Sequence, residues 1–370
     1  MNLRIVVINN HATSVLGFRW PIISGLKNQR CKVIVFAPRD GKVVIALAKE
    51  QVNYHSIPIA RAGLNPFRDV FLFFKLYFSL KKIKPDKILC YTAKPVIYGS
   101  IAAYFAGVKQ CFSVITGLGY VFIGDSLQKR ILRKVVIFLY RFALKFNHKV
   151  FFQNKDDLAL FLNYKMIDQN KTIRIGGSGV DLDYFKKELL PQQCSFLLLA
   201  RLLKEKGVIE YFMAAERIKQ KYPDVNCKLA GEFDSNPAAL SKKELNYWLQ
   251  RSQVEYLGYL TDVRPAIANA SVYVLPSYRE GTPRSVLEAM AMGRPVITTD
   301  TPGCRDTVED GINGYLIPVE NVDKLYWAME QFILRPELIS KMGKESRRIA
   351  EEEYDVNKVN NVILQTMGIS

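Results

Sequence analysis

The stretch from Glu280 to Asp300 reads Glu-Gly-Thr-Pro-Arg-Ser-Val-Leu-Glu-Ala-Met-Ala-Met-Gly-Arg-Pro-Val-Ile-Thr-Thr-Asp, and it predicts a loop, a helix and a buried strand in that order. Thr282 suits the N-cap, Pro283 suits the first helical position, and Gly293 suits the left-handed residue that ends a helix. The run from Arg294 to Thr299 is the strand. A helix followed at once by a buried strand is typical of a parallel α/β sheet.

The start of this helix is a predicted anion site. We expect the backbone at Pro283, Arg284, Ser285 and Val286 to face a phosphate, because the N-terminal end of a helix favours negative charge. Glu288, in the second turn, is placed to accept two hydrogen bonds from a ribose diol.

Glu280, in the loop before the helix, is placed to bind the hydroxyls of a sugar held beyond the phosphates. The alternative for each of the two glutamates is a capping or surface carboxylate.

A second segment brings two cations to the same place. The buried strand that ends at Ala200 is followed by Arg201, and Lys206 stands at the start of the next helix. Arginine offers a planar fork for two phosphate oxygens and lysine a mobile point charge, so the pair suits a diphosphate. The alternative is a surface ion pair with Glu205 or a solvated loop.

Strand and helix patterns alternate along the whole chain and predict two Rossmann-like, doubly wound α/β domains that face a cleft. The glycine-rich segment 175–181 is the expected hinge. We expect an acceptor-binding domain over 1–178, a nucleotide-sugar-binding domain over 179–350, and a helix over 351–370 that could return to the first domain. The expected strands are 3–9, 32–37, 87–91, 110–115, 149–152, 195–200, 226–230, 255–257, 271–275 and 294–299.

The net charge of +17 lies almost entirely in the first half of the 370 residues. Residues 1–180 hold 28 Lys and Arg against 8 Asp and Glu, whereas residues 181–370 hold 24 against 27. In segments 70–82 and 130–141 the basic residues alternate with long apolar ones, which favours a membrane surface over a nucleic-acid groove. The alternative is a pair of core helices with solvated basic faces.

The six cysteines are scattered and only three histidines are present, so the sequence indicates neither a disulfide framework nor a zinc site. We therefore expect a reducing, cytoplasmic setting. No run of about 18 uncharged apolar residues is present, so no membrane span is predicted. The expected location is the inner face of the cytoplasmic membrane, as a peripheral protein.

The spaced residues of the second half resemble glycosyltransferase family 4. The resemblance implies the GT-B fold, a UDP-sugar or similar nucleotide-sugar donor, retention of anomeric configuration, and no required metal or other cofactor. It implies that Arg201 and Lys206 hold the diphosphate, that Glu288 binds the ribose and that Glu280 contacts the donor sugar. The residues concerned are Ala200-Arg201, Lys206-Gly207, Pro276-Ser277, Glu280-Gly281-x-Pro283-x4-Glu288-Ala289 and Gly293-x-Pro295-Val296.

Three segments of the first half resemble the branch of this family that acts on undecaprenyl-diphosphate-linked sugars. The resemblance implies a lipid-diphosphate-linked saccharide as acceptor, in the assembly of a bacterial surface polysaccharide or glycoprotein glycan. The resemblance also implies that Gly17, in the first loop, binds the donor, although many members of the family carry a pair of glycines in that loop. Many members have a histidine near the position of Thr116 that contacts the donor sugar, and this chain has none there. Arg61 and Lys94 are candidates for binding the lipid diphosphate. The segments are 18–23, 64–67 and 116–120.

Four other functions are alternatives at this point. A paired-carboxylate glycosidase is disfavoured because it has no need of a diphosphate site. A sugar-nucleotide epimerase or a phosphorylase could use the same fold, and an epimerase would need no acceptor. A nucleic-acid-binding protein would use the basic half, but the sequence has no recognisable binding module and would leave the residues from Arg201 to Glu288 without a role.

Overall fold

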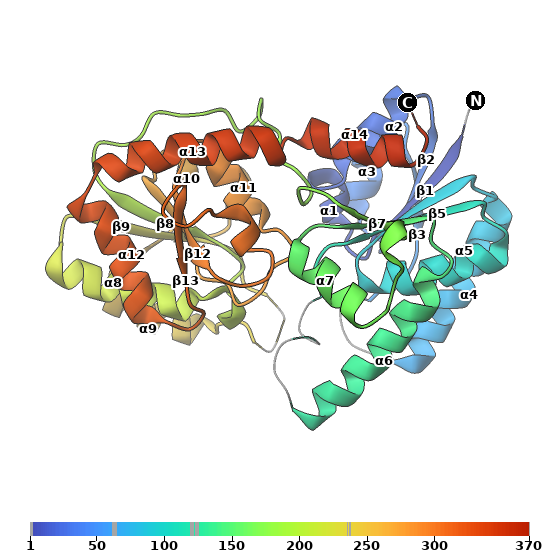
Figure 1. Cartoon of the computed structure of the whole chain (residues 1–370), viewed down its shortest axis with the longest axis horizontal. Helices are drawn as coiled ribbons and strands as arrows, with labels where there is room; N and C mark the ends of the chain where they lie inside the picture. Colours follow the sequence, from blue (N-terminus) through green and yellow to red (C-terminus); the bar gives the residue numbers. More distant parts are fainter. Residues whose placement is uncertain are drawn as a thin grey trace. The chain divides into compact units, whose positions relative to one another are not determined.

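The computed structural model describes residues 3–60, 65–118, 122, 126–234, 236 and 238–369, and within these the chain forms two compact units (Figure 1). Unit 1 comprises residues 1–178 and 357–370, and unit 2 comprises residues 179–356. The boundary at Ser178 falls within the glycine-rich segment. Arg61, a candidate acceptor residue, lies outside the described residues, as do parts of the segments 64–67 and 116–120.

Unit 1 is built on a parallel sheet of seven strands in the order β3-β2-β1-β4-β5-β6-β7. The strand order reverses between β1 and β4, so the chain winds outward in both directions from the middle of the sheet. The central strands are almost wholly buried apolar runs, as expected for a sheet covered on both faces. The strands are β1 (Arg4–Ile8), β2 (Lys32–Ala37), β3 (Asn53–Ser56), β4 (Lys87–Tyr91), β5 (Gln110–Ile115), β6 (Lys149–Phe152) and β7 (Thr172–Arg174).

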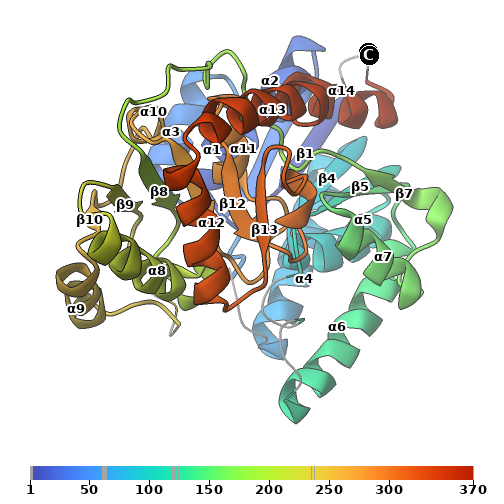
Figure 2. The ribbon, with the colours of Figure 1, turned by 60° about the vertical axis from the view of Figure 1, so that its left-hand side comes forward.

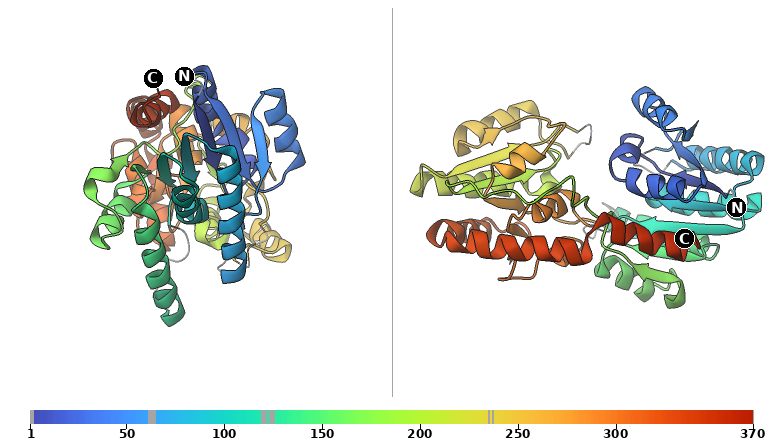
Figure 3. Two further views of the ribbon diagram at one scale, coloured as in Figure 1. Left: turned by 90° about the vertical axis from the view of Figure 1, so that its right-hand side faces the viewer. Right: turned by 90° about the horizontal axis from the view of Figure 1, so that it is seen from above.

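Two helical layers cover the sheet of unit 1 (Figure 3). One core joins one face of the sheet to α4 (Pro66–Ile83), the π-helical turn η1 (Pro95–Gly99), α5 (Ser100–Ala106), α6 (Leu127–Leu144) and α7 (Lys155–Asn163). The other core joins the opposite face to α1 (Thr13–Gly17), α2 (Trp20–Asn28), α3 (Gly41–Lys49) and α14 (Val356–Thr366). A short 3-10 helix, η3 (Gln169–Lys171), precedes β7.

The helix α14 completes unit 1 although it follows unit 2 in the sequence. Val359, Ile363 and Leu364 are buried in the same core as β1, β2 and α2. Gly25 of α2 gives Leu364 room, since a Cβ there would lie 3.2 Å from the leucine side chain. The side chain of Lys87 also donates a hydrogen bond to the carbonyl of Met367.

Unit 2 has a parallel sheet of six strands in the order β10-β9-β8-β11-β12-β13, with a reversal between β8 and β11. Figure 2 shows β8, β9, β10, β12 and β13 of this sheet. The strands are β8 (Ser195–Leu199), β9 (Asn226–Ala230), β10 (Glu255–Tyr256), β11 (Val272–Leu275), β12 (Val296–Thr299) and β13 (Gly314–Ile317). One core joins the sheet to α8 (Val208–Lys221), α9 (Lys242–Ser252) and α12 (Val322–Leu334). The other joins it to α10 (Arg264–Ala268), α11 (Arg284–Ala291) and the C-terminal part of α13 (Glu337–Glu353).

The two doubly wound parallel sheets confirm the predicted fold class. The sequence missed β3 and β7, because each lies at an edge of its sheet and carries partly exposed polar residues. It also missed β13, which begins with glycine. None of the helices in the described residues is both long and apolar enough to cross a bilayer.

Candidate functional site

In unit 2 the candidate residues gather where the strand order reverses. Arg201 follows β8, and Glu280 lies in the loop between β11 and α11. β8 and β11 are neighbours in the sheet. Parallel strands end at one edge of a sheet, and in this class of fold ligands bind at that edge where the order reverses. The topology therefore brings the predicted cations and carboxylates of unit 2 together.

The backbone around Lys206 has a conformation that requires glycine at the next position, residue 207. Lys204–Lys206 form a short 3-10 helix, η4, and Gly207 then adopts φ of 72°. A Cβ at Gly207 would lie 2.1 Å from the carbonyl oxygen of Pro276, so no larger residue fits. The carbonyl of Glu205 also accepts from the backbone N–H of Tyr278 at 2.9 Å. The loops after β8 and β11 are thus fixed against each other.

The side chain of Lys206 forms an ion pair with Glu280. Their side chains are 15% and 16% exposed, so water screens this pair only in part. The backbone of Glu280 is also fixed, because its N–H donates to the carbonyl of Pro302 at 3.0 Å. Gly303, in the loop after β12, has φ of 79° and lets this loop approach the loop that holds Glu280, since a Cβ at Gly303 would lie 2.4 Å from the carbonyl oxygen of Glu280.

Arg201 is paired with a carboxylate that the sequence did not single out. Its guanidinium group forms an ion pair with Asp234, which follows β9. The predicted alternative partner was Glu205, but the structure places Asp234 in that role. Asp234 could have been anticipated only from the strand order, because β9 lies next to β8 in the sheet.

The helix α11 begins one residue later than predicted. Its N-cap is Pro283 and not Thr282, and no side chain caps it. Pro283 has no N–H to offer, and the N–H of Val286 donates to the carbonyl of Pro283 at 3.0 Å. Within the described part of the chain, no backbone carbonyl accepts from the N–H of Ser285. The expected group of free N–H donors is therefore smaller than predicted.

Glu288 lies on the second turn of α11 and pairs with Arg284, whose Nε donates to Glu288 Oε1 at 2.9 Å. Burial raises the pKa of Glu288, and the Arg284 charge opposes that rise. Burial also raises the pKa of the neighbouring Tyr273 hydroxyl, and the charges of Glu288 and Glu280 add to this effect.

Arg294 has a structural role that was not predicted from the sequence. The residue was expected to open a strand, but β12 begins at Val296 and Arg294 is completely buried. Its guanidinium group donates to five backbone carbonyls, at distances of 2.9 to 3.0 Å. A charged residue inside an apolar run was the signal for this role. The carbonyls belong to Ile267, Ala268, Glu188, Leu189 and Met292.

In unit 1 the described candidates follow β1, β4 and β5, which are neighbouring strands. Gly17 ends α1, and a Cβ there would meet no atom within 4 Å. Thr116 directly follows β5 and is half-buried. Lys94 precedes the π-helical turn η1, and its Nζ lies 2.6 Å from Asp69 Oδ1 on α4. The Tyr98 hydroxyl donates to the other oxygen of Asp69 at 3.2 Å and so fixes this carboxylate, which in turn holds Lys94.

Among the residues that the structure describes, no group of three or more His, Cys, Asp or Glu is placed to hold a metal ion. The site of unit 2 instead consists of three cation–carboxylate pairs. The pairs are Arg201 with Asp234, Lys206 with Glu280, and Arg284 with Glu288.

Comparison with known proteins identifies the family of the chain. Residues 180–349 match the family model described as glycosyl transferases group 1, and residues 4–154 match the model described as glycosyl transferase 4-like. The chain is 30% identical to the N,N'-diacetylbacillosaminyl-diphospho-undecaprenol alpha-1,3-N-acetylgalactosaminyltransferase of Campylobacter jejuni, over 96% of both chains. It is 23% identical to the UDP-Gal:alpha-D-GlcNAc-diphosphoundecaprenol alpha-1,3-galactosyltransferase of Escherichia coli, over 91% of this chain and 92% of that enzyme.

Solved structures show the same fold over the full length. The Anabaena protein HepE, crystallised with UDP and glucose, matches with a TM-score of 0.80 at 19% identity and covers 99% of both chains. A sequence likeness that spans nearly the whole chain, together with the two family models, confirms the resemblance drawn from the spaced motifs. This chain therefore belongs to glycosyltransferase family 4.

Proposed function

We propose that this glycosyltransferase moves an N-acetylhexosamine or hexose from a UDP-sugar to an undecaprenyl-diphosphate-linked saccharide, with retention of anomeric configuration. The observation that supports it best is the set of three ion pairs at the reversal of strand order in unit 2. The names of the Campylobacter jejuni and Escherichia coli relatives describe transfer to diphospho-undecaprenol-linked sugars. HepE has been crystallised with UDP-glucose, which supports the choice of donor.

The ion pairs are suited to a ligand that carries two negative charges. Arg201 and Lys206 are already positioned by carboxylates, so a diphosphate that arrives meets cations whose side chains are ordered. The diphosphate replaces the carboxylate as the partner of Lys206, which leaves Glu280 to accept hydrogen bonds from the sugar hydroxyls. Glu288, held by Arg284, accepts from the ribose diol.

The proposed chemistry is mainly electrostatic. The acceptor hydroxyl attacks the anomeric carbon on the face from which UDP leaves, and the leaving phosphate oxygen takes the proton. Arg201, Lys206 and the N–H of Ser285 stabilise the charge that develops on the diphosphate. No protein base is required on this route.

Unit 1 is the proposed acceptor unit and the side that faces the inner leaflet of the membrane. Thr116 and Lys94 follow neighbouring strands of its sheet, and Arg61 remains a candidate for the lipid diphosphate. Lys94 could bind it only by leaving Asp69, its partner in the structure. Assembly of a surface polysaccharide such as O-antigen or capsule, or of a glycoprotein glycan, would use such an acceptor.

The decisive experiment offers a panel of UDP-sugars with undecaprenyl-diphosphate-linked mono- and disaccharides and identifies the product by mass spectrometry and NMR. Arg201→Ala should lower turnover by about a hundredfold or more, because one donor to a developing negative charge contributes roughly that factor. Arg217→Ala is the matched control, because Arg217 pairs with Asp323 on the exposed surface of unit 2. Near-normal transfer by Arg201→Ala would refute the assignment, and isomerised donor without acceptor would indicate an epimerase.

A further inference from the structure

The helix α4 has three distinct faces. Leu72, Leu76 and Leu80 are buried against the sheet. At 100° per residue, Phe71 and Phe78 point almost directly away from that buried face. They belong to a wider exposed apolar face with Phe67, Val70 and Phe74.

Basic residues line one flank of this exposed apolar face. Arg68, Lys75 and Lys82 follow one another at intervals of seven residues, so they lie along one side of the helix. All three are exposed. The pattern of an apolar face with a flanking basic row is typical of a helix that lies in the interface of an anionic membrane.

The helix α6 belongs to the same layer and repeats the pattern. Five of its apolar residues are exposed and lie opposite its buried face, at spacings of three and four residues. Since α4 and α6 pack on the same face of the sheet, their outer faces both point away from it. The exposed apolar residues of α6 are Leu127, Ile131, Val135, Phe138 and Phe142.

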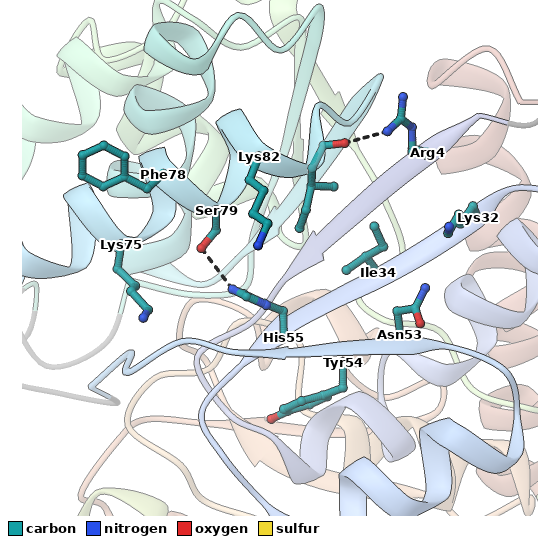
Figure 4. A pocket seen from close by; sticks show the side chains of 11 residues that line it. Arg4, Lys32, Ile34, Asn53, Tyr54, His55, Lys75, Phe78, Ser79 and Lys82 are labelled. Atoms are coloured by element: carbon teal, nitrogen blue, oxygen red, sulfur yellow. Dashed lines mark hydrogen bonds between the residues drawn. The ribbon is translucent and has the colours of Figure 1, made fainter.

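A basic pocket of about 700 Å³ opens beside the lysine flank of α4 (Figure 4). Arg4 and Lys32, the first residues of β1 and β2, line it together with Lys75 and Lys82 of α4. The pocket therefore lies at the amino ends of these strands. Lys94 and Thr116, the candidate acceptor residues that the structure describes, follow the carboxyl ends of β4 and β5, so the pocket is separate from them.

The positive charge of this pocket is not balanced by its own lining. None of its lining residues in the described part of the chain is acidic, and Lys32, Lys75 and Lys82 form no ion pair there. The Arg4 guanidinium donates to the carbonyl of Ile83 at 2.8 Å, and the nearby Asp86 carboxylate, which does not line the pocket, accepts from the backbone N–H of Arg4 at 2.8 Å. Burial lowers the pKa of His55 in the pocket, and the charges of Lys75 and Lys82 lower it further.

We propose that this pocket binds the phosphate of an anionic phospholipid headgroup while the exposed aromatic face of α4 enters the lipid interface. The charge of the pocket is complementary to a phosphate, and Phe78 both lines the pocket and belongs to the exposed apolar face. An occupant that offers an anion next to an apolar phase satisfies both features, and a bilayer surface is such an occupant. The proposal rests on the membrane association proposed above and adds a defined lipid site to it.

The first test measures flotation of the full chain with neutral phosphatidylcholine vesicles and with vesicles of three parts phosphatidylcholine to one part phosphatidylglycerol. Lys75→Gln/Lys82→Gln should weaken binding to the anionic vesicles by roughly 25-fold, since each basic residue near such a surface contributes about fivefold. Binding to neutral vesicles should stay unchanged. Lys42→Gln/Lys49→Gln is the matched control, because it removes the same charge from α3 on the opposite face of the sheet. Equal losses in the two variants would overturn the proposal.

The second test locates the headgroup by NMR of the three histidine rings. The groups that face His55 are Lys75, Lys82 and Ser79 of α4, with Arg4 and Lys32 from the sheet. An anion bound among them should raise the pKa of His55, and His148 serves as the internal reference. Soluble dihexanoyl-phosphatidylglycerol should produce this rise, and the phosphatidylcholine analogue should not.

The outcomes separate the lipid site from its alternatives. No change at His55 would overturn the proposal, and an equal rise with inorganic phosphate would assign the pocket to a free anion. Sugar transfer to a short-chain, soluble acceptor should be the same in the wild type and in Lys75→Gln/Lys82→Gln. A failure of the proposed sugar transfer would instead show as an inactive wild type, with the lipid results unaffected.

Discussion

Replacing Lys206 by methionine tests whether its ion pair with Glu280 serves catalysis or only stability. The change keeps the length of the side chain but removes its charge, and it leaves a carboxylate that is 16% exposed without its cation. Breaking a fully buried pair costs about 3 to 5 kcal/mol, so we expect about 2 kcal/mol for this partly exposed one. In a unit of this size that corresponds to a fall in Tm of about 4 to 8 °C.

The same change should lower kcat by a factor of about 10² to 10³, because Lys206 would no longer stabilise the leaving diphosphate. Two further variants separate the causes. Glu280→Gln should strengthen UDP binding, measured by calorimetry, because no carboxylate then competes with the diphosphate for Lys206. Lys206→Met/Glu280→Gln should regain most of the lost Tm and none of the lost kcat.

Recovery of kcat in the double variant to within about tenfold of wild type would refute this reasoning, because a positioned cation is worth more than that factor. It would show that Lys206 acts only by neutralising Glu280. Lys221→Met is the control, since Lys221 also pairs with a glutamate, Glu330, but is 60% exposed. It should cost less than about 1 kcal/mol and leave kcat unchanged.

Three further changes give distinct results. Arg294→Met leaves five buried carbonyls without their donor and should destabilise unit 2 by about 3 to 5 kcal/mol in urea unfolding, whereas Arg294→Lys should restore part of the loss. Gly207→Ala places a methyl group 2.1 Å from the carbonyl oxygen of Pro276 at a φ of 72°, so we expect a lower Tm and weaker UDP binding; an unchanged Tm would contradict the close approach. Burial raises the pKa of Glu288, so above pH 4.5 the folded protein holds a proton that the unfolded chain has released. The free energy of unfolding should therefore fall as pH rises from 4.5 through the folded-state pKa. Glu288→Gln should flatten that dependence in urea titrations between pH 4 and pH 8.

The strands that are buried on both faces could be predicted from the sequence almost to the residue. β2, β4, β5 and β6 have the predicted bounds, because continuous apolar runs between polar turns leave little choice of register. The edge strands β3 and β7 could not be predicted, since their stability comes from one hydrogen-bonded neighbour and not from an apolar pattern. Local signals thus define these interior strands better than the edge strands β3 and β7.

In the candidate site, too, local features could be predicted from the sequence, whereas contacts that depend on strand order could not. The positions of Arg201 and Lys206 after a buried strand follow from local pattern, and so does Gly293, which has φ of 79° after α11. The partner of Arg201 could not be predicted from local pattern, because Asp234 lies near Arg201 only as a result of the pairing of β8 with β9. The end of α11 could be predicted and its start could not, since Pro283 takes the capping position that Thr282 was expected to fill. Contacts between loops depend on strand order, which a single sequence specifies only indirectly.

The placement of α14 has a consequence for how the chain acquires its structure during synthesis. Unit 2 is one continuous segment and has all of its core residues once residue 356 has left the ribosome. Unit 1 emerges first, but Val359, Ile363 and Met367 of its core are made last, after all of unit 2. Until then β1, β2 and α2 leave apolar surface uncovered. At about 5 to 20 residues per second, we expect that exposure to last roughly 10 to 40 seconds, and we therefore expect unit 1 to depend more on chaperones than unit 2, although it is the first to be made.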